Sequence, residues 1–116
     1  MTTISNKELC LSYLRKYAVK DLSGIEAMFS EDIILRDWKI RVTGKETAVA
    51  ETQKNFQAAD TIAIAVLATY ESDDTVAAEL KITVNGSEEL FVVDVITFNP
   101  EGLITSIRAY LGRGDH

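Results

Sequence analysis

The sequence contains few of the residues that build disulfide frameworks and metal centres. Its 116 residues include one cysteine, Cys10, and one histidine, His116, which is the last residue and is expected to fray. A single cysteine cannot form an intramolecular disulfide, so the sequence shows no framework of a disulfide-stapled secreted domain. A single terminal histidine argues against zinc sites and histidine-based catalytic triads. We therefore predict no metal site.

The sequence also lacks a long apolar run and an excess of basic residues. No apolar run approaches the roughly 20 residues that a membrane helix needs, and the first ten residues contain no apolar core of a signal peptide. Because 12 basic residues stand against 18 acidic ones, the net charge is −6. Phosphate backbones are bound by clustered Lys and Arg, so a nucleic-acid partner is not expected. A cytoplasmic protein without a membrane partner is the prediction.

The hydrophobic pattern changes its period once, near residue 60. Helical spacing comes before this point and strand alternation after it. The chain has the length of one domain, and its 47% hydrophobic and 26% charged residues are ordinary globular usage. Because no repeat or linker interrupts the pattern, we predict a single domain over residues 1–116.

Three capping-box patterns predict helix starts in the first half of the chain. Ser5, Ser23 and Thr43 are each followed by a glutamate three residues later. The first helix carries an apolar stripe up to residue 18, the second runs through residue 29, and the third ends near residue 59. Between the second and third helices, Asp32–Trp38 is predicted to be a short strand.

The second half of the chain predicts four consecutive strands. Their expected ranges are Ile62–Tyr70, Val76–Val84, Glu89–Phe98 and Leu103–Leu111. Asn85-Gly86 is a strong hairpin turn because both residues tolerate positive φ. Helices followed by sequential strands predict an α+β fold in which the helices pack on a strongly curved antiparallel sheet. A cone-shaped pocket is expected between the two layers.

The strand that contains Asp94 is apolar on both faces. One alternating set includes Leu90, Val92 and Ile96, and the other includes Phe91 and Val93. A sheet with one wet face would show polar residues in one of these sets. We therefore predict that a second copy of the protein covers the outer face in a homodimer. The alternative is a cover formed by the C-terminal tail or the first helix.

Asp94 is the most informative single residue, because a buried ionised carboxylate costs several kcal/mol unless it is paired. Three outcomes are open. Asp94 pairs with a cation such as Arg108 or Lys81, it accepts several hydrogen bonds while ionised, or it stays protonated and donates one.

Asp37 and Tyr13 are two further candidates for chemistry. Asp37 continues the inward face of its strand to the edge of the pocket, beside Trp38, where an acid can act as a proton-transfer base. A merely exposed strand-end acid is the alternative. Tyr13 lies on the apolar stripe of the first helix and is either a core residue or a hydroxyl donor opposite Asp94.

Several stretches together resemble the nuclear transport factor two superfamily, which includes ketosteroid isomerases and SnoaL-like polyketide cyclases. They are Tyr13–Asp21, Gly24–Asp32, Arg36–Trp38, Gly44–Glu46, Val93–Phe98 with Glu101-Gly102, and Arg108–Tyr110. The resemblance covers nearly the whole chain and implies a cystatin-like cone with an internal pocket. These patterns occur throughout the superfamily, so they support the fold strongly and the activity weakly.

Within the ketosteroid isomerases, the resemblance implies that Asp37 is the base and that Tyr13 and a protonated Asp94 stabilise an enolate. The implied ligand is small, apolar and carbonyl-containing, and no cofactor is needed. The implied pocket-lining residues are Tyr17, Phe29, Trp38, Phe56, Ile96, Phe98 and Ile107. The chain departs from the family at Trp38, where proline is frequent, and at Leu111, where an aromatic residue is expected. A polyketide cyclase-like enzyme and a non-catalytic ligand-binding or dimerisation module are the alternatives.

Overall fold

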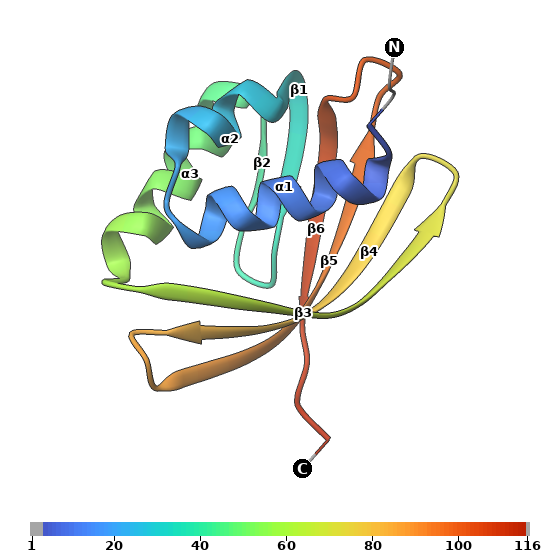
Figure 1. The fold of residues 1–116 in the computed structure, drawn as a ribbon. Coiled ribbons are helices and arrows are strands. Elements are labelled where there is room, and N and C mark those ends of the chain that lie inside the picture. Colours follow the sequence, from blue (N-terminus) through green and yellow to red (C-terminus); the bar gives the residue numbers. More distant parts are fainter. Residues whose placement is uncertain (1–3, 116) are drawn as a thin grey trace.

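The computed structural model describes residues 4–115, so His116 lies outside the described residues. Three helices pack on one side of a strongly curved six-stranded sheet (Figure 1). The elements are α1 (Asn6–Ala18), α2 (Leu22–Met28), β1 (Phe29–Arg36), β2 (Arg41–Thr43), α3 (Lys45–Ala58), β3 (Ile62–Ser72), β4 (Thr75–Val84), β5 (Glu88–Phe98) and β6 (Ile104–Leu111). The α+β cone predicted from the sequence is confirmed. Within residues 4–115, none of the helices has the length and hydropathy of a membrane-spanning segment.

One of the three predicted helix caps forms. The Ser5 hydroxyl accepts the backbone N–H of Glu8 at 3.1 Å, as predicted. Helix α2 is capped instead by the Asp21 carboxylate, which accepts the N–H of Gly24 at 3.0 Å, so the prediction for Ser23 was wrong. The prediction for Thr43 was also wrong, because Thr43 pairs with β1 as the last residue of β2 and Gly44 takes the N-cap position.

The first strand starts earlier and ends earlier than predicted. It covers Phe29–Arg36, so Asp37 lies in the turn that leads to β2. Strand β2 was not predicted, because three residues are too few to show alternation. The sheet order is β2-β1-β6-β5-β4-β3, and β1 runs parallel to β6. The sheet is therefore mostly rather than fully antiparallel.

The four later strands are confirmed as an antiparallel series. Strand β3 contains an irregularity between Val66 and Ala68 that shifts its register against β4. One extra residue at a bulge reverses the direction of the side chains that follow it. Tyr70 accordingly lies on the outer face, where its hydroxyl donates to Glu79 at 2.8 Å. Strict alternation along the predicted strand Ile62–Tyr70 would place Tyr70 on the same face as Ile62, and this expectation is wrong beyond Val66.

The helices cover the concave face of the sheet, here called the inner face (Figure 1). The inner-facing side chains of β4 and β5 are buried in the core. They include Val76, Ala78, Leu80, Val92, Ile96 and Phe98. The opposite face, here called the outer face, carries the other alternating set of β5, whose members are half-buried. Strand β5 therefore separates a covered face from an open one.

Candidate active site

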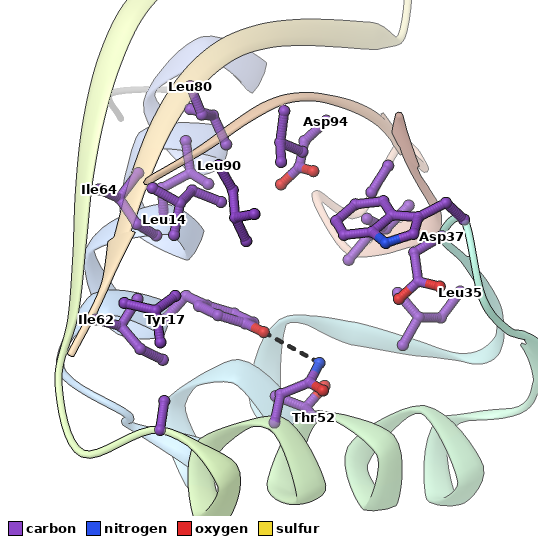
Figure 2. Close-up of a pocket in the computed structure, with 18 of the residues that line it drawn as sticks. Leu14, Tyr17, Leu35, Asp37, Thr52, Ile62, Ile64, Leu80, Leu90 and Asp94 are labelled. Atoms are coloured by element: carbon purple, nitrogen blue, oxygen red, sulfur yellow. Dashed lines mark hydrogen bonds between the residues drawn. The ribbon is translucent and has the colours of Figure 1, made fainter. Parts of the chain in front are cut away.

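A cavity of about 370 Å³ lies between the helices and the inner face of the sheet (Figure 2). This volume is within the range of small-molecule sites. Most of its walls are aliphatic and come from α1, β1 and the inner face of β3 to β6. These side chains include Leu14, Leu35, Ile62, Ile64, Leu80, Ile82, Leu90, Val92 and Ile107. Such a cavity suits a ligand that is itself mostly apolar.

Asp94 projects from the middle of β5 into this cavity (Figure 2). It is 9% exposed, and within residues 4–115 its carboxyl group has no hydrogen-bond or ion-pair partner. Burial away from water disfavours the charged form and raises the pKa of Asp94 to about 7. A carboxyl group in this environment exists in both protonation states near neutral pH.

The cationic partners considered for Asp94 lie on the other side of the sheet. Arg108 pairs in register with Val95, whose side chain points to the outer face, whereas Asp94 pairs with Ala109. Lys81 also lies on the outer face, where its ammonium group contacts the Glu89 carboxylate at 2.8 Å. The salt-bridge outcome is therefore excluded for both residues, because side chains alternate across a strand.

Tyr13 reaches the same cavity from helix α1. It is 4% exposed, and its hydroxyl has no hydrogen-bond partner within residues 4–115. Burial first, and the negative charge of Asp94 second, hold the pKa of Tyr13 well above its usual value. Burial and, to a smaller extent, the negative charge of Asp94 also raise the pKa of Cys10 to about 12. Tyr13 is therefore a neutral donor that lies within the electrostatic reach of Asp94.

Asp37 lines the cavity from the turn between β1 and β2 (Figure 2). Its Oδ1 atom accepts the backbone N–H groups of Lys39 at 2.7 Å and Ile40 at 2.9 Å. This local hydrogen bonding shapes the turn. The Oδ1 atom of Asp37 is thus engaged in the turn, whereas its Oδ2 atom has no hydrogen-bond partner within residues 4–115. No pattern in the sequence indicated that Asp37 would hold this turn.

A hydrogen bond between Tyr17 and Asn55 was also not predicted from the sequence. The Asn55 amide donates to the Tyr17 hydroxyl at 3.2 Å across the cavity wall, from α3 to α1 (Figure 2). Burial raises the pKa of Tyr17, while this hydrogen bond opposes the increase. The ring of Tyr17 stacks edge-on against Phe56, with centroids 4.9 Å apart. Asn55 lies on an otherwise polar, exposed stretch of α3, so no sequence pattern marks it.

The predicted pocket-lining residues divide into two groups. Tyr17, Trp38 and Ile107 line the cavity, and Trp38 is 43% exposed. The other four lie in the buried core that supports the cavity walls: Phe29, Phe56, Ile96 and Phe98. The three residues that were predicted to be catalytic, Tyr13, Asp37 and Asp94, all line this cavity.

Within residues 4–115, no three His, Cys, Asp or Glu side chains lie close enough together to bind a metal ion. The sequence-based expectations that no cofactor is needed and that the protein is cytoplasmic stay predictions.

The fold and the cavity together define a nuclear transport factor two-like cone with an internal small-molecule pocket. The family model of the SnoaL-like domain matches residues 11–107, so the chain belongs to the SnoaL-like family. Among curated proteins, none matches the sequence significantly.

Three solved structures illustrate what the chain is similar to. A candidate ketosteroid isomerase from Kribbella flavida superposes with a TM-score of 0.82 at 17% identity, covering 96% of this chain and 80% of that one. A candidate SnoaL-like polyketide cyclase from Shewanella putrefaciens gives 0.80 at 11% identity, covering 94% and 80%. The epoxide hydrolase/cyclase-like enzyme SalBIII of pyran ring formation in polyether salinomycin gives 0.80 at 26% identity, covering 92% and 90%.

Proposed function

We propose that this protein is an enzyme that moves a proton next to the carbonyl group of a small, largely apolar substrate. One observation carries the proposal: Asp94 places an unpartnered carboxyl group in an apolar cavity. Leaving a buried polar group without a partner costs free energy, and a ligand that completes the hydrogen bond recovers it. Perturbed acids in clefts are frequently functional groups for this reason.

Three side chains have distinct roles in the proposed reaction. The Asp37 carboxylate removes a proton from the carbon next to the carbonyl group and later returns it at another carbon. Tyr13 and the protonated form of Asp94 donate hydrogen bonds to the oxygen, where the negative charge develops. The reaction is thus an isomerisation similar to that of steroid Δ-isomerases. The neutral state of Tyr13 and the raised pKa of Asp94 support the two donor roles.

The test is a panel of β,γ-unsaturated ketones of different sizes, with turnover followed by the absorbance of the conjugated product. Asp37→Asn should lower the rate by about 10²–10⁴-fold, because it removes the general base. Tyr13→Phe and Asp94→Leu should each lower it by about 10²–10³-fold, because each removes one donor to the enolate.

The matched control is Glu26→Gln, which changes an exposed acid on α2 and should leave turnover unchanged. Unfolding curves confirm that each variant is folded. Absence of wild-type turnover on every ketone of the panel would contradict the isomerase proposal, and equal rates for Asp37→Asn and the wild type would contradict the role of Asp37.

A second candidate function is cyclisation, favoured by the 26% identity to SalBIII. In this reaction a protonated Asp94 gives its proton to an epoxide oxygen as the carbon–oxygen bond breaks. A hydroxyl group of the same substrate attacks the carbon, and Asp37 takes the hydroxyl proton. Incubation with a hydroxy-epoxide tests this directly, because the cyclic ether has the same mass as the substrate but a different chromatographic retention.

A third candidate, ligand binding without catalysis, is favoured by the engagement of Asp37 Oδ1 in its own turn. In that case Asp37→Asn would leave ligand affinity nearly unchanged, and no substrate of either class would be consumed. Calorimetric titration of a non-reactive saturated ketone compares the affinities directly.

We also propose that two copies associate through their outer faces. Phe91, Val93 and Val95 give β5 an apolar outer set that neither the helices nor the C-terminal residues up to 115 bury fully. Exposed apolar patches of this kind are typical of association surfaces. Val93→Asp should convert the dimer to a monomer, as measured by sedimentation velocity, while the ligand affinity of the cavity is retained. A wild-type protein that sediments as a monomer at high concentration would contradict the proposal.

A further inference from the structure

Three arginines from neighbouring strands form a row across the outer face. Arg36 of β1 pairs in register with Arg41 of β2 on one side and with Arg108 of β6 on the other. Residues that pair directly across strands point to the same face. This arginine row, Arg41–Arg36–Arg108, therefore brings three positive charges together at the β1 side of the outer face.

The arginine row is not neutralised by an ion pair within residues 4–115. Arg36 donates to the Tyr110 hydroxyl at 2.5 Å and lies 5.1 Å from the centre of that ring. The Nε atom of Arg108 is buried without any hydrogen-bond partner. Like charges on directly paired residues destabilise a sheet. An anionic group from outside the chain would reduce the repulsion between the three guanidinium groups and would supply acceptors for their unpaired N–H groups.

The surroundings of the arginine row are those of a protein interface. Arginine and tyrosine are enriched at such interfaces, and the apolar residues Val93 and Val95 lie beside the row on β5. A face built for water would instead carry Lys and Glu throughout. The net charge of −6 makes a polyanionic partner such as nucleic acid a poor match.

Glu79 of β4 lies at the position that corresponds, across β5, to Tyr110 of β6. Val93 of β5 pairs with Tyr110 on one side and with Glu79 on the other, so β6 and β4 flank it symmetrically. Glu79 is half-buried, and its only hydrogen bond in the described chain comes from Tyr70. It has no cationic partner within residues 4–115. A two-fold axis along β5 exchanges the β6 side with the β4 side.

We infer that the arginine row of one copy meets Glu79 of a second copy, and that this contact fixes a two-fold axis along β5. The axis brings Glu79 of the second copy opposite Tyr110, where the Arg36 guanidinium already lies. The contact occurs twice in a symmetric dimer. This inference rests on the outer-face dimer proposed above and adds to it the charged contact that selects its orientation.

The test is a charge exchange measured by sedimentation equilibrium. Arg36→Glu places two acids against each other in its homodimer, and Glu79→Arg places two cations against each other. Each variant alone should dimerise about 100-fold more weakly than the wild type, because like charges then oppose each other at both symmetry-related contacts. An equimolar mixture of the two variants should form a 1:1 heterodimer, since both contacts are then between opposite charges.

Arg15→Glu is the matched control, because it reverses an arginine on the exposed side of α1, away from the outer face. It should leave dimerisation unchanged. Thermal unfolding of Arg36→Glu and Glu79→Arg checks that both are folded, and Arg108→Glu replaces Arg36→Glu in the mixture if the latter unfolds.

The outcomes separate the two proposals. A wild-type monomer overturns the dimer itself. A wild-type dimer with two variants that dimerise as strongly as the wild type overturns the arginine–Glu79 contact and leaves the dimer standing. Weakened variants that do not associate on mixing also overturn the contact, because mixing then fails to restore any attraction.

Discussion

The two faces of strand β5 differ in what they leave without a partner. On the inner face, Asp94 lies in a mostly apolar cavity and forms no ion pair within residues 4–115. On the outer face, Arg36 and Arg108 lie on a surface that the helices leave uncovered, and neither forms an ion pair within residues 4–115. Arg108 is on β6, the neighbour of β5, and the sheet keeps its side chain apart from that of Asp94 because the two point to opposite faces.

The two faces therefore suit partners of different size. A cavity of about 370 Å³ admits a small molecule but no polypeptide, so an unpaired group inside it is available to a small ligand alone. An open sheet face with apolar and cationic residues instead offers area, which is what a second folded chain needs. One strand therefore supplies both a ligand site and an association surface, with alternate residues.

The largest effect expected from this comparison is a pH dependence of stability that comes from Asp94. Its pKa is about 7 in the folded protein, against an ordinary value of 3.8. Between these two values the folded state binds more protons than the unfolded state, so stability falls as the pH rises from about 4 to about 7. The loss is about 4 kcal/mol.

The measurement is urea unfolding of the wild type and of Asp94→Asn across this pH range. The asparagine at position 94 of the variant does not titrate. The free energy of unfolding of the wild type, measured relative to the variant, should therefore fall by most of the loss of about 4 kcal/mol as the pH rises towards 7, and should level off at higher pH. A difference that is constant with pH would show that Asp94 is solvated or paired, and the contrast between the faces would fail.

The second effect is a contrast between adjacent residues of β5. Ile96 is 0% exposed on the inner face, whereas Val95 is half-buried on the outer face. Ile96→Ala should cost about 3 kcal/mol because it removes packed atoms and leaves a cavity. In a monomeric background such as Val93→Asp, Val95→Ala should cost less than about 1 kcal/mol. Comparable costs in that background would mean that the outer face is covered within the single chain.

The smallest effect concerns the hydrogen bond between Tyr17 and Asn55 at the cavity wall. Tyr17→Phe should lower the free energy of unfolding by about 1 kcal/mol, and Asn55→Ala by a similar amount. Because both residues share one bond, the double variant should cost clearly less than the sum of the two single variants. Strict additivity in chemical denaturation would show that the bond does not contribute in solution.

The alternating pattern was sufficient to predict much of the architecture. Each of the four later strands is long enough to show period two, and the pattern in β5 placed Asp94 on the same face as Val92 and Ile96. The same pattern failed in β3, where the bulge after Val66 reversed the direction of Tyr70. A bulge is a property of the pairing between two strands, and one strand read by itself does not reveal it.

The sequence predicted which residues reach the cavity better than it predicted the hydrogen bonds that these residues form. Tyr13, Asp37 and Asp94 all reach the cavity, but the hydrogen bonds of Asp37 with its own turn and of Tyr17 with Asn55 were not foreseen. Tyr17 and Asn55 are separated by 38 positions in the chain. Their contact depends on how α1 and α3 pack, which a local pattern does not encode.

Residue periodicity was enough to predict the three helices and the four long later strands, and to place an acid among the buried residues of one of these strands. These properties follow from residue periodicity, since the backbone geometry of one strand or helix fixes which side chains share a face. Tertiary packing decided that β1 runs parallel to β6, so that Arg36 and Arg108 lie side by side, and that Asp94 forms no ion pair within residues 4–115. Those outcomes depend on which strands become neighbours, and the free energy of that choice is distributed over the whole core.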